Sequence, residues 1–277
     1  MKFGKVANPE TIDFSLPKDF TVNGTVLSGK KKDNIQISIG YPKWNKQQLS
    51  GFYPKKVKDE LTYYATQLNA IELNATYYRN YSPEQYQKWA DKVPDDFRFY
   101  PKISQSISRY RKLIDVDDRV EYLAEGLGKL GDKLGMAFLQ MDNFFSPDYF
   151  KNLEKFIVKW PKQYPLAVEL RHKDWFNSKQ INDEVYHLFK ENKVTHVLTD
   201  THERRDILHM KLTTPHAFIR FVDAEHALDY ERLDDWVRQL KIWINNGLEG
   251  VHFFIHRKEV LEEPYLINYI KKELKTI

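Results

Sequence analysis

Short segments in which apolar and polar side chains alternate recur along the chain, and each is followed by a segment with helical periodicity. In residues 166–171, LAVELR, one face is aliphatic and the other carries Glu169 and Arg171. Because similar segments surround this one, we expect a strand of a parallel sheet that is buried on both faces. The predicted strands are residues 35–40, 70–74, 97–102, 134–140, 166–171, 194–200, 217–222 and 251–256.

The segments between these strands carry the start and stop signals of helices. Ser82, Pro83 and Glu84 supply an N-cap residue, a proline in the first turn and an acidic side chain near the positive end of the helix dipole. The same signal recurs at residues 146–148, and Gly247 ends the last long periodic segment before the final strand. The predicted helices are residues 54–68, from 82 onward, 116–130, from 146 onward, 179–192, a short or irregular segment near 206–212, 230–246 and 259–274.

Eight strands, each followed by a helix or a substitute for one, predict an α/β fold of the TIM type, a (β/α)8 barrel that leaves no edge strand. A chain of 277 residues suits one such barrel, for which about 250 residues are typical. An open doubly wound sheet is the alternative, but its usual GxGxxG turn is missing after the first strand, where residues 40–44 read GYPKW. We therefore expect one barrel domain at residues 35–277 and an N-terminal extension at residues 1–34 that packs on the barrel as an arm.

Composition narrows the class of protein. A hydrophobic content of 42% is enough for a sizeable core, and the absence of cysteine excludes disulfides, thiolate metal sites and a cysteine nucleophile. No segment has the apolar centre of a signal peptide or the roughly 18 apolar residues of a membrane span. We therefore expect a cytoplasmic protein without membrane contacts, and the sequence indicates no particular oligomeric state.

Positive charge is concentrated in two stretches. Residues 30–58 carry eight lysines and one acid, and residues 98–112 carry five basic residues and no acid, whereas the whole chain has a net charge of +4. We expect both stretches to flank the C-terminal ends of the first and third strands, where they would attract an anionic ligand. The alternative is that most of these side chains are solvated loop charges.

Polar side chains are expected inside the barrel. If the aliphatic face of each strand packs on the outer helices, the opposite face points inward, mostly near the C-terminal ends of the strands, where barrel enzymes place their chemistry. Burying an unpaired charge costs several kcal/mol, so these groups must pair with one another or bind a ligand. The alternative to a ligand site is an ion-pair network that only holds the barrel. The predicted inward side chains are Ser38, Glu72, Asn74, Tyr100, Lys102, Phe138, Gln140, Glu169, Arg171, Asp200, Phe218, Arg220, Phe254 and His256.

Acid/base and anion-binding roles can be assigned within this set. Glu169 is the first candidate for a catalytic acid or base, followed by Asp200 and Glu72. Arg171 offers a planar fork that suits a phosphate or carboxylate group. The further candidates for substrate binding are Lys102, Arg220, Asn74, Gln140 and His256. An in-barrel salt bridge is the alternative for Glu169 and Arg171, and a plain hydrogen-bond network is the alternative for Glu72 and Asn74.

Lys102 has two possible roles. It could form a Schiff base if desolvation and positive neighbours depress its pKa. More often a lysine in this position is a cation that holds a phosphate or carboxylate, and we favour that role from the sequence.

Aromatic side chains follow several of the predicted strands. Five of them could surround the barrel mouth and stack on a sugar or a base, namely Trp44, Tyr77, Tyr78, Tyr81 and Trp175. The alternative is that they pack the loops on the barrel rim. All nine histidines lie at or after His172. Asp200 with His202 and a third ligand, Glu169 or His256, could make an oxygen–nitrogen metal site, but no HExxH motif or other metal-ligand spacing is present. We therefore predict no metal and no other cofactor.

Several phrases are similar to those of a known family. They are Trp44 with GFYP (51–54), IELNATYYR (71–79), Trp89 with VPDDFRF (93–99), KISQSISR (102–109), KLGMAFLQM (133–141), AVELRHKDW (167–175) and VLTD (197–200). From about Ile35 to the C-terminus the chain resembles the YecE-like family, also called domain of unknown function 72. The resemblance implies a TIM-type barrel and carries no established activity. The stretches 217–225 and 252–258 depart from the family pattern: the first lacks a His-Gly pair and the second has His256 and Arg257 where an Asn-rich end is common.

These observations favour an enzyme that acts by acid/base chemistry on a small anionic, hydroxylated molecule, such as a phosphorylated sugar or a nucleotide-like compound. A lyase, isomerase or hydrolase fits better than an oxidoreductase, because the sequence has no dinucleotide-binding fingerprint. The alternative is a non-catalytic nucleic-acid-binding module that uses the basic loops and the aromatic rim. A structural barrel with an inert ion-pair core is a third possibility.

Overall fold

Parallel strands alternate with helices along the chain, as the sequence predicts. The computed structural model describes residues 8–49, 51–257 and 265–275. The strands are β1 (Gln36–Gly40), β2 (Ala70–Leu73), β3 (Arg98–Pro101), β4 (Ala137–Gln140), β5 (Leu166–Glu169), β6 (Thr195–His196), β7 (Leu198–Asp200), β8 (His216–Val222) and β9 (Gly250–His256). Each predicted strand is therefore present, and the one predicted at residues 194–200 is divided into β6 and β7 at Val197.

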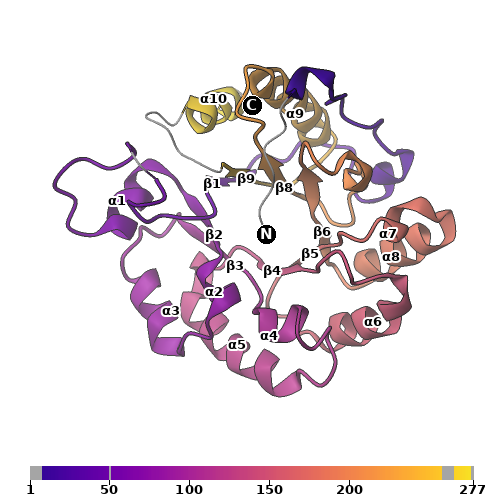
Figure 1. Ribbon diagram of the computed structural model, residues 1–277, viewed down its shortest axis with the longest axis horizontal. Helices are drawn as coiled ribbons and strands as arrows, with labels where there is room; N and C mark the ends of the chain where they lie inside the picture. Colours follow the sequence, from indigo (N-terminus) through magenta and orange to yellow (C-terminus); the bar gives the residue numbers. More distant parts are fainter. Residues whose placement is uncertain (1–7, 50, 258–264, 276–277) are drawn as a thin grey trace.

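Helices cover the outside of the strands (Figure 1). They are α1 (Glu60–Gln67), α2 (Ala75–Tyr78), α3 (Pro83–Ala90), α4 (Gln105–Ser108), α5 (Asp117–Leu130), α6 (Phe150–Lys159), α7 (Asp174–Asn177), α8 (Lys179–Glu191), α9 (Leu228–Asn245) and α10 (Tyr265–Leu274). The predicted start of α3 after Ser82 is confirmed. None of the described helices is long and apolar enough to cross a membrane.

Three helix predictions need correction. The helix predicted from residue 54 begins only at Glu60, because the Asp59 side chain accepts a hydrogen bond from the Thr62 N–H (2.9 Å) and caps the helix there. The segment predicted near residues 206–212 is a single 3-10 turn, Arg205–Ile207. The predicted start of the last helix at residue 259 lies outside the described residues, and α10 is described from Tyr265.

The strands surround a central axis and form three parallel sheets (Figure 1). The first has the order β1-β9-β8-β7, the second consists of β2 and β3, and the third has the order β4-β5-β6. The predicted α/β fold is confirmed at this level. The prediction of one continuous sheet is not, because among the described residues side chains and single contacts replace regular strand pairing between the sheets.

Asn69 joins β1 to the start of β2. Its side-chain oxygen accepts from the Ile39 N–H (2.9 Å), and its amide nitrogen donates to the Ile37 carbonyl (2.6 Å). The Tyr64 hydroxyl accepts from the Tyr41 N–H and donates to the Ala70 carbonyl. These two side chains therefore satisfy backbone groups that a neighbouring strand would otherwise pair.

Isolated contacts link the other sheets. Bridges pair Phe99 with Leu134 and Lys102 with Phe138, so β3 lies beside β4. Between β6 and β7, the Val197 N–H donates to the Val168 carbonyl of β5 at 2.9 Å. Each sheet is thus connected to the next, and the strand ends share one polarity.

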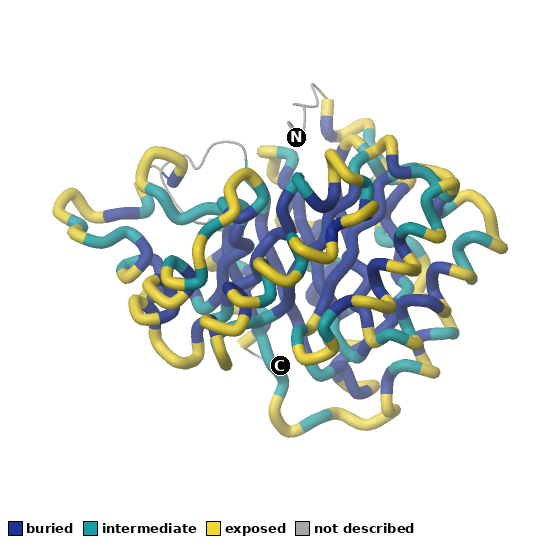
Figure 2. The backbone as a smooth tube through the Cα atoms, turned by 90° about the horizontal axis from the view of Figure 1, so that it is seen from below, coloured by how far each residue is buried: buried dark blue, intermediate teal, exposed yellow. Residues whose placement is uncertain are grey.

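The interior contains a small apolar cluster that is separate from the main core. The main core fills the space between strands and helices, and buried backbone forms the centre of the molecule in Figure 2. The inner cluster consists of Ala70, Tyr100, Met136, Phe138, Ala167, Val197, Phe218 and Phe254. Nearer the N-terminal ends of β8 and β9, a series of side-chain hydrogen bonds links His216 to His252, His252 to Tyr100 and Tyr100 to Ser38. The rings of Tyr100, Phe138, Phe218 and Phe254 pack against one another with centroids 4.9–5.6 Å apart and form a layer across the interior.

The N-terminal segment packs beside α9. The Asp19 carboxylate accepts from Trp243 Nε1 (2.9 Å) and Gln239 Nε2 (3.0 Å), and Asn23 donates to the Met210 carbonyl (2.7 Å). Lys32 pairs with Glu249, which precedes β9, at 3.1 Å. The prediction that the whole basic stretch 30–58 flanks the C-terminal ends of the strands is therefore wrong, because its first lysines lie at the opposite end.

Candidate functional site

An open cavity of about 560 Å³ lies at the C-terminal ends of the strands. Its walls combine cationic, amide and aromatic side chains, which come from the strand ends and the loops that follow them. The residues that line it are Pro42, Lys43, Trp44, Asn45, Gln48, Glu72, Leu73, Asn74, Ala75, Tyr78, Lys102, Gln140, Arg171, Arg220 and His256. This volume lies within the range of ordinary small-molecule sites.

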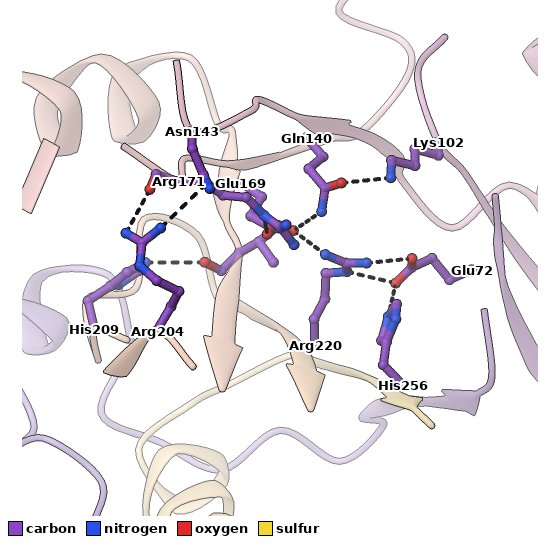
Figure 3. A network of polar contacts seen from close by, with 11 residues as sticks. Glu72, Lys102, Gln140, Asn143, Glu169, Arg171, Arg204, His209, Arg220 and His256 are labelled. Carbon is purple, nitrogen blue, oxygen red and sulfur yellow. Dashed lines mark hydrogen bonds and ion pairs between the residues drawn. The ribbon is translucent and has the colours of Figure 1, made fainter. Parts of the chain in front are cut away.

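Arg220 connects two carboxylates at the base of the cavity (Figure 3). Its Nε and Nη2 each lie 2.9 Å from an oxygen of Glu72, and its Nη1 lies 2.5 Å from Glu169 Oε2. The three side chains come from β8, β2 and β5 and are at most 3% exposed. The predicted inward orientation of all three is confirmed.

Glu169 is held in its ionised form. Arg171 Nε donates to Glu169 Oε1, and Gln140 Nε2 donates to Oε2 at 2.9 Å. Burial alone would raise the pKa of Glu169, but Arg171 and Arg220 outweigh it and lower the pKa to about 2. Glu72 is buried as well, and Arg220 and His256 hold its pKa well below the usual value. Neither carboxylate is therefore poised to exchange a proton near neutral pH.

Lys102 contacts the cavity from the residue after β3. Its Nζ donates to Gln140 Oε1 at 2.7 Å and lies 4.2 Å from the centre of the Tyr77 ring. Burial, with Arg220 nearby, lowers the pKa of Lys102 to about 7. Lys102 is thus a cavity cation whose charge changes in the neutral range.

His256 and Asn74 complete the shell around Glu72. His256 Nε2 lies 2.9 Å from Glu72 Oε2, and Asn74 Nδ2 donates to Oε1 at the same distance. Burial lowers the pKa of His256 below its usual value, although Glu72 opposes the shift, so the ring is neutral at neutral pH. Because an ionised carboxylate only accepts hydrogen bonds, Nε2 carries the proton and Nδ1 the lone pair.

Asp200 does not face the cavity, and its predicted inward orientation is wrong. Its carboxylate accepts from Arg232 Nη2 and Trp236 Nε1 of α9, each at 2.8 Å, and pairs with Arg205. The stretch VTHVLTD misled the assignment because Val197 and Leu198 place one aliphatic side chain on each face. In the structure Val197 belongs to the inner cluster, so Leu198 and Asp200 point outward.

The predicted rim aromatics have different positions, and Tyr78 lines the cavity as predicted. Trp44 lines the cavity and packs edge-on against Trp89, with ring centroids 5.9 Å apart. The Tyr77 ring lies against the Lys102 amine, with its centre 4.2 Å from Nζ. Trp175 is only 1% exposed and donates to the Phe145 carbonyl (2.6 Å), so its placement at the mouth is wrong. Hydrophobic packing of the loop after β5 accounts for its position.

The sequence reasoning missed three polar cavity residues. They are Lys43, Asn45 and Gln48, which lie in the loop after β1. Strand alternation cannot orient side chains in a loop, although the position of this loop directly after a strand is itself a signal. Lys43 adds a further cation, and its Nζ donates to the Arg257 carbonyl at 3.1 Å.

The geometry also separates the residues considered as metal ligands. Within the described ranges, no group of three or more His, Cys, Asp or Glu side chains is arranged to hold a metal ion. His256 contacts Glu72, whereas Asp200 is engaged by α9. The combination of Asp200 with Glu169 or His256 is therefore excluded by position.

Comparison with known proteins shows which family this chain resembles. Residues 38–276 match the family described as "Protein of unknown function DUF72". The UPF0759 protein YecE of Escherichia coli is 25% identical over 261 residues, which cover 86% of this chain and 93% of YecE. The UPF0759 protein YunF of Bacillus subtilis is 26% identical over 150 residues, which cover 51% of this chain and 52% of YunF.

Two crystal structures of DUF72 family proteins share the fold. The protein from Enterococcus faecalis gives a TM-score of 0.68 at 19% identity, over 88% of this chain and 99% of that one. The protein from Thermotoga maritima gives 0.64 at 21% identity, over 87% and 99%. The resemblance seen in the sequence is confirmed, and since the family match covers most of its length, this chain belongs to the DUF72 family.

Proposed function

We propose that the three sheets are arcs of one TIM-type (β/α)8 barrel formed by residues 35–277, with residues 1–34 as an arm on its surface. The strand segments β6 and β7 count as one interrupted strand, which gives eight. The contacts between the sheets support this barrel, because they lie where the pairing of neighbouring strands would continue around it. They are the hydrogen bonds of Asn69 and Tyr64, the bridges between β3 and β4, and the contact of Val197 with Val168. The cavity then lies where barrel enzymes hold their substrates.

The protein binds a small anionic, hydroxylated molecule in this cavity. The observation that carries the proposal is a local excess of positive charge. Lys43, Lys102, Arg171 and Arg220 line the cavity together with Glu72, and Glu169 pairs with both arginines. Asp223, whose charge acts on Lys43, is itself paired with Arg257. These described residues carry a surplus of two positive charges when both lysines are protonated. A phosphate or carboxylate would neutralise this surplus. The amides of Asn45, Asn74 and Gln140 suit hydroxyl groups, and the Trp44 ring suits the face of a sugar.

Acid/base chemistry on this molecule falls to His256 rather than to Glu169. Glu72 orients the His256 ring and fixes its tautomer, which is the arrangement of a carboxylate–histidine general base. Glu169 instead fixes Arg171, the main anchor of the anion. The reaction is of the lyase, isomerase or hydrolase type.

Thermal-shift measurements with phosphate, sulfate, citrate and sugar phosphates test the anion site. We expect at least one of them to raise the melting temperature of the wild type. Loss of one charge-assisted contact costs about 1.5–3 kcal/mol, so Arg171→Ala should lower the affinity roughly ten- to a hundredfold, and Arg171→Lys should recover only part of it. If no anion stabilises the wild type, or Arg171→Ala keeps the full shift, the cavity charges are a structural ion-pair network.

A second candidate function is binding of single-stranded nucleic acid across the same face. Tyr78, Tyr110 and Phe144 are 66%, 68% and 78% exposed and follow β2, β3 and β4. Arg109 and Arg111 lie beside Tyr110, so exposed rings and positive charge occur together. Fluorescence anisotropy with a labelled oligonucleotide at several salt concentrations tests this function. Affinity that falls steeply with salt supports it, and no binding at low salt rejects it.

A further inference from the structure

We propose that Lys102 is a covalent catalytic residue that forms a Schiff base with the carbonyl carbon of the bound anion. This inference rests on the proposed anion site and narrows its ligand to an anionic aldehyde or ketone, such as a phosphorylated sugar in its open-chain form or a 2-oxo acid. It also changes the role of Lys102 from a fixed cation to a nucleophile.

The backbone of Lys102 is held on both sides. Its N–H donates to the Leu73 carbonyl (3.1 Å), its carbonyl accepts from Thr76 Oγ1 (2.8 Å), and it forms an isolated bridge with Phe138. The residue is only 7% exposed, yet it lines the cavity. The amine is therefore presented to the cavity from a rigid position between β2 and β4, which favours a defined attack geometry.

The partners of the Lys102 amine are uncharged. Gln140 Oε1 accepts one hydrogen bond, and the Tyr77 ring covers another side. Gln140 is itself oriented by its donation to Glu169, so its oxygen faces the amine. In the part of the chain that the structure describes, no carboxylate oxygen lies within 4.0 Å of Lys102 Nζ, whereas Glu72 and Glu169 are each paired with Arg220.

An amine in this setting can remain neutral. Burial and Arg220 lower the pKa of Lys102 to about 7, so roughly half of it is unprotonated at neutral pH. An ordinary lysine, with a pKa of about 10.4, has on the order of a thousandfold less neutral amine at that pH. The neutral amine can donate one hydrogen to Gln140 and direct its lone pair at a carbonyl carbon.

The reaction balances without an oxidant or a reductant. The nitrogen lone pair attacks the carbonyl carbon, and one N–H proton moves to the oxygen to give a carbinolamine. The C–O bond then breaks, the hydroxyl group leaves as water with a proton taken from solvent, and the nitrogen forms the C=N bond. The resulting iminium carries one positive charge and one N–H, so the cavity keeps its attraction for the anionic end of the ligand.

Reductive trapping tests the proposal on the wild-type protein. Dihydroxyacetone phosphate, glycolaldehyde phosphate and pyruvate are each added with sodium cyanoborohydride at pH 7, and labelled lysines are located by peptide mass mapping. Lys112 is the internal reference, because it also has one oxygen acceptor (Tyr149 OH, 2.6 Å) and a ring at 4.3 Å but lies outside the cavity. We expect at least one probe to label Lys102 ten or more times faster than Lys112.

Two variants and an uncharged probe serve as controls of the trapping experiment. Lys102→Arg should abolish the fast label, and Lys112→Arg should keep it. Glycolaldehyde without phosphate should show a smaller preference for Lys102, because it lacks the anion. If no probe labels Lys102 faster than Lys112 while phosphate still raises the melting temperature, the Schiff base is wrong and the anion site stands. If phosphate has no effect either, the proposed function fails as well.

Discussion

His256 Nε2 lies 2.9 Å from Glu72 Oε2, where β9 and β2 both end. Burial lowers the pKa of His256, and the Glu72 carboxylate opposes that shift. Glu72→Gln removes the opposing charge, so we expect the pKa of His256 to fall further. Titration of the imidazole signals by NMR measures it, with His256→Asn used to assign the resonance. A pKa of His256 that rises in Glu72→Gln would contradict this account.

Arg220→Met should strongly destabilise the protein. It leaves two buried carboxylates without their shared cation, and breaking a buried ion pair in this way costs about 3–5 kcal/mol. Urea unfolding provides the measurement. The control is Lys159→Ala, whose partner Asp117 is 61% exposed, and it should cost no more than about 1 kcal/mol. Equal effects of the two substitutions would argue against a buried network.

Acid should unfold the protein partly through Glu169. Its pKa is about 2 in the folded state and 4.5 as a free side chain, so the folded state favours the ionised form. This stabilisation is fully present above pH 4.5 and is lost as the pH falls towards 2, a difference on the order of 3 kcal/mol. The free energy of unfolding of Glu169→Gln should depend less on pH in that window. Parallel pH profiles of the two proteins would show the prediction to be wrong.

Asp200→Asn should lower the stability of the protein without changing how it binds an anion. Asp200 is fully buried and holds Arg232, Arg205 and Trp236, so we expect a loss of about 2–4 kcal/mol in unfolding free energy. The stabilisation that an anion confers should stay unchanged, because Asp200 does not reach the cavity. The melting temperature with and without phosphate measures both quantities. A reduced phosphate shift in this variant would return Asp200 to the site.

Asn69→Ala tests the junction between β1 and β2. It removes two hydrogen bonds to the backbone of Ile37 and Ile39 and should cost about 1–3 kcal/mol. Hydrogen exchange at the Ile39 amide should accelerate more than at Phe253, which lies opposite Ile39 in the β1–β9 pair. Equal protection of both amides would mean that Asn69 is dispensable for the junction.

Side-chain alternation was sufficient for most of the interior and insufficient at its margins. Glu72, Glu169 and Arg220 could be predicted to converge, because the opposite face of each strand is apolar and must pack on helices. Asp200 could not, since its strand offers an aliphatic side chain on both faces. Trp175 lies in the four-residue helix α7 that follows β5, which is too short to show a helical period in the sequence, so only tertiary packing decides whether it reaches the mouth or the core.

The partner choices within the site were also beyond the sequence. Counting charges predicts that acids and bases pair, but not that Arg220 takes both carboxylates and leaves Lys102 with an amide. That choice depends on side-chain reach and on the relative height of each residue on its strand. Burial, with Arg220 nearby, then lowers the pKa of Lys102.

The layer formed by Tyr100, Phe138, Phe218 and Phe254 closes the inner end of the cavity. These rings are completely buried and separate the charged groups from the His216–His252 chain below. Among the described residues, this layer closes the cavity on the side of the N-terminal strand ends, so we expect ligand and product to use the C-terminal side and a product to depart before the next molecule binds. For any reaction in this cavity, product and substrate should compete for the same entrance, and the release of a bulky product should limit the rate of turnover.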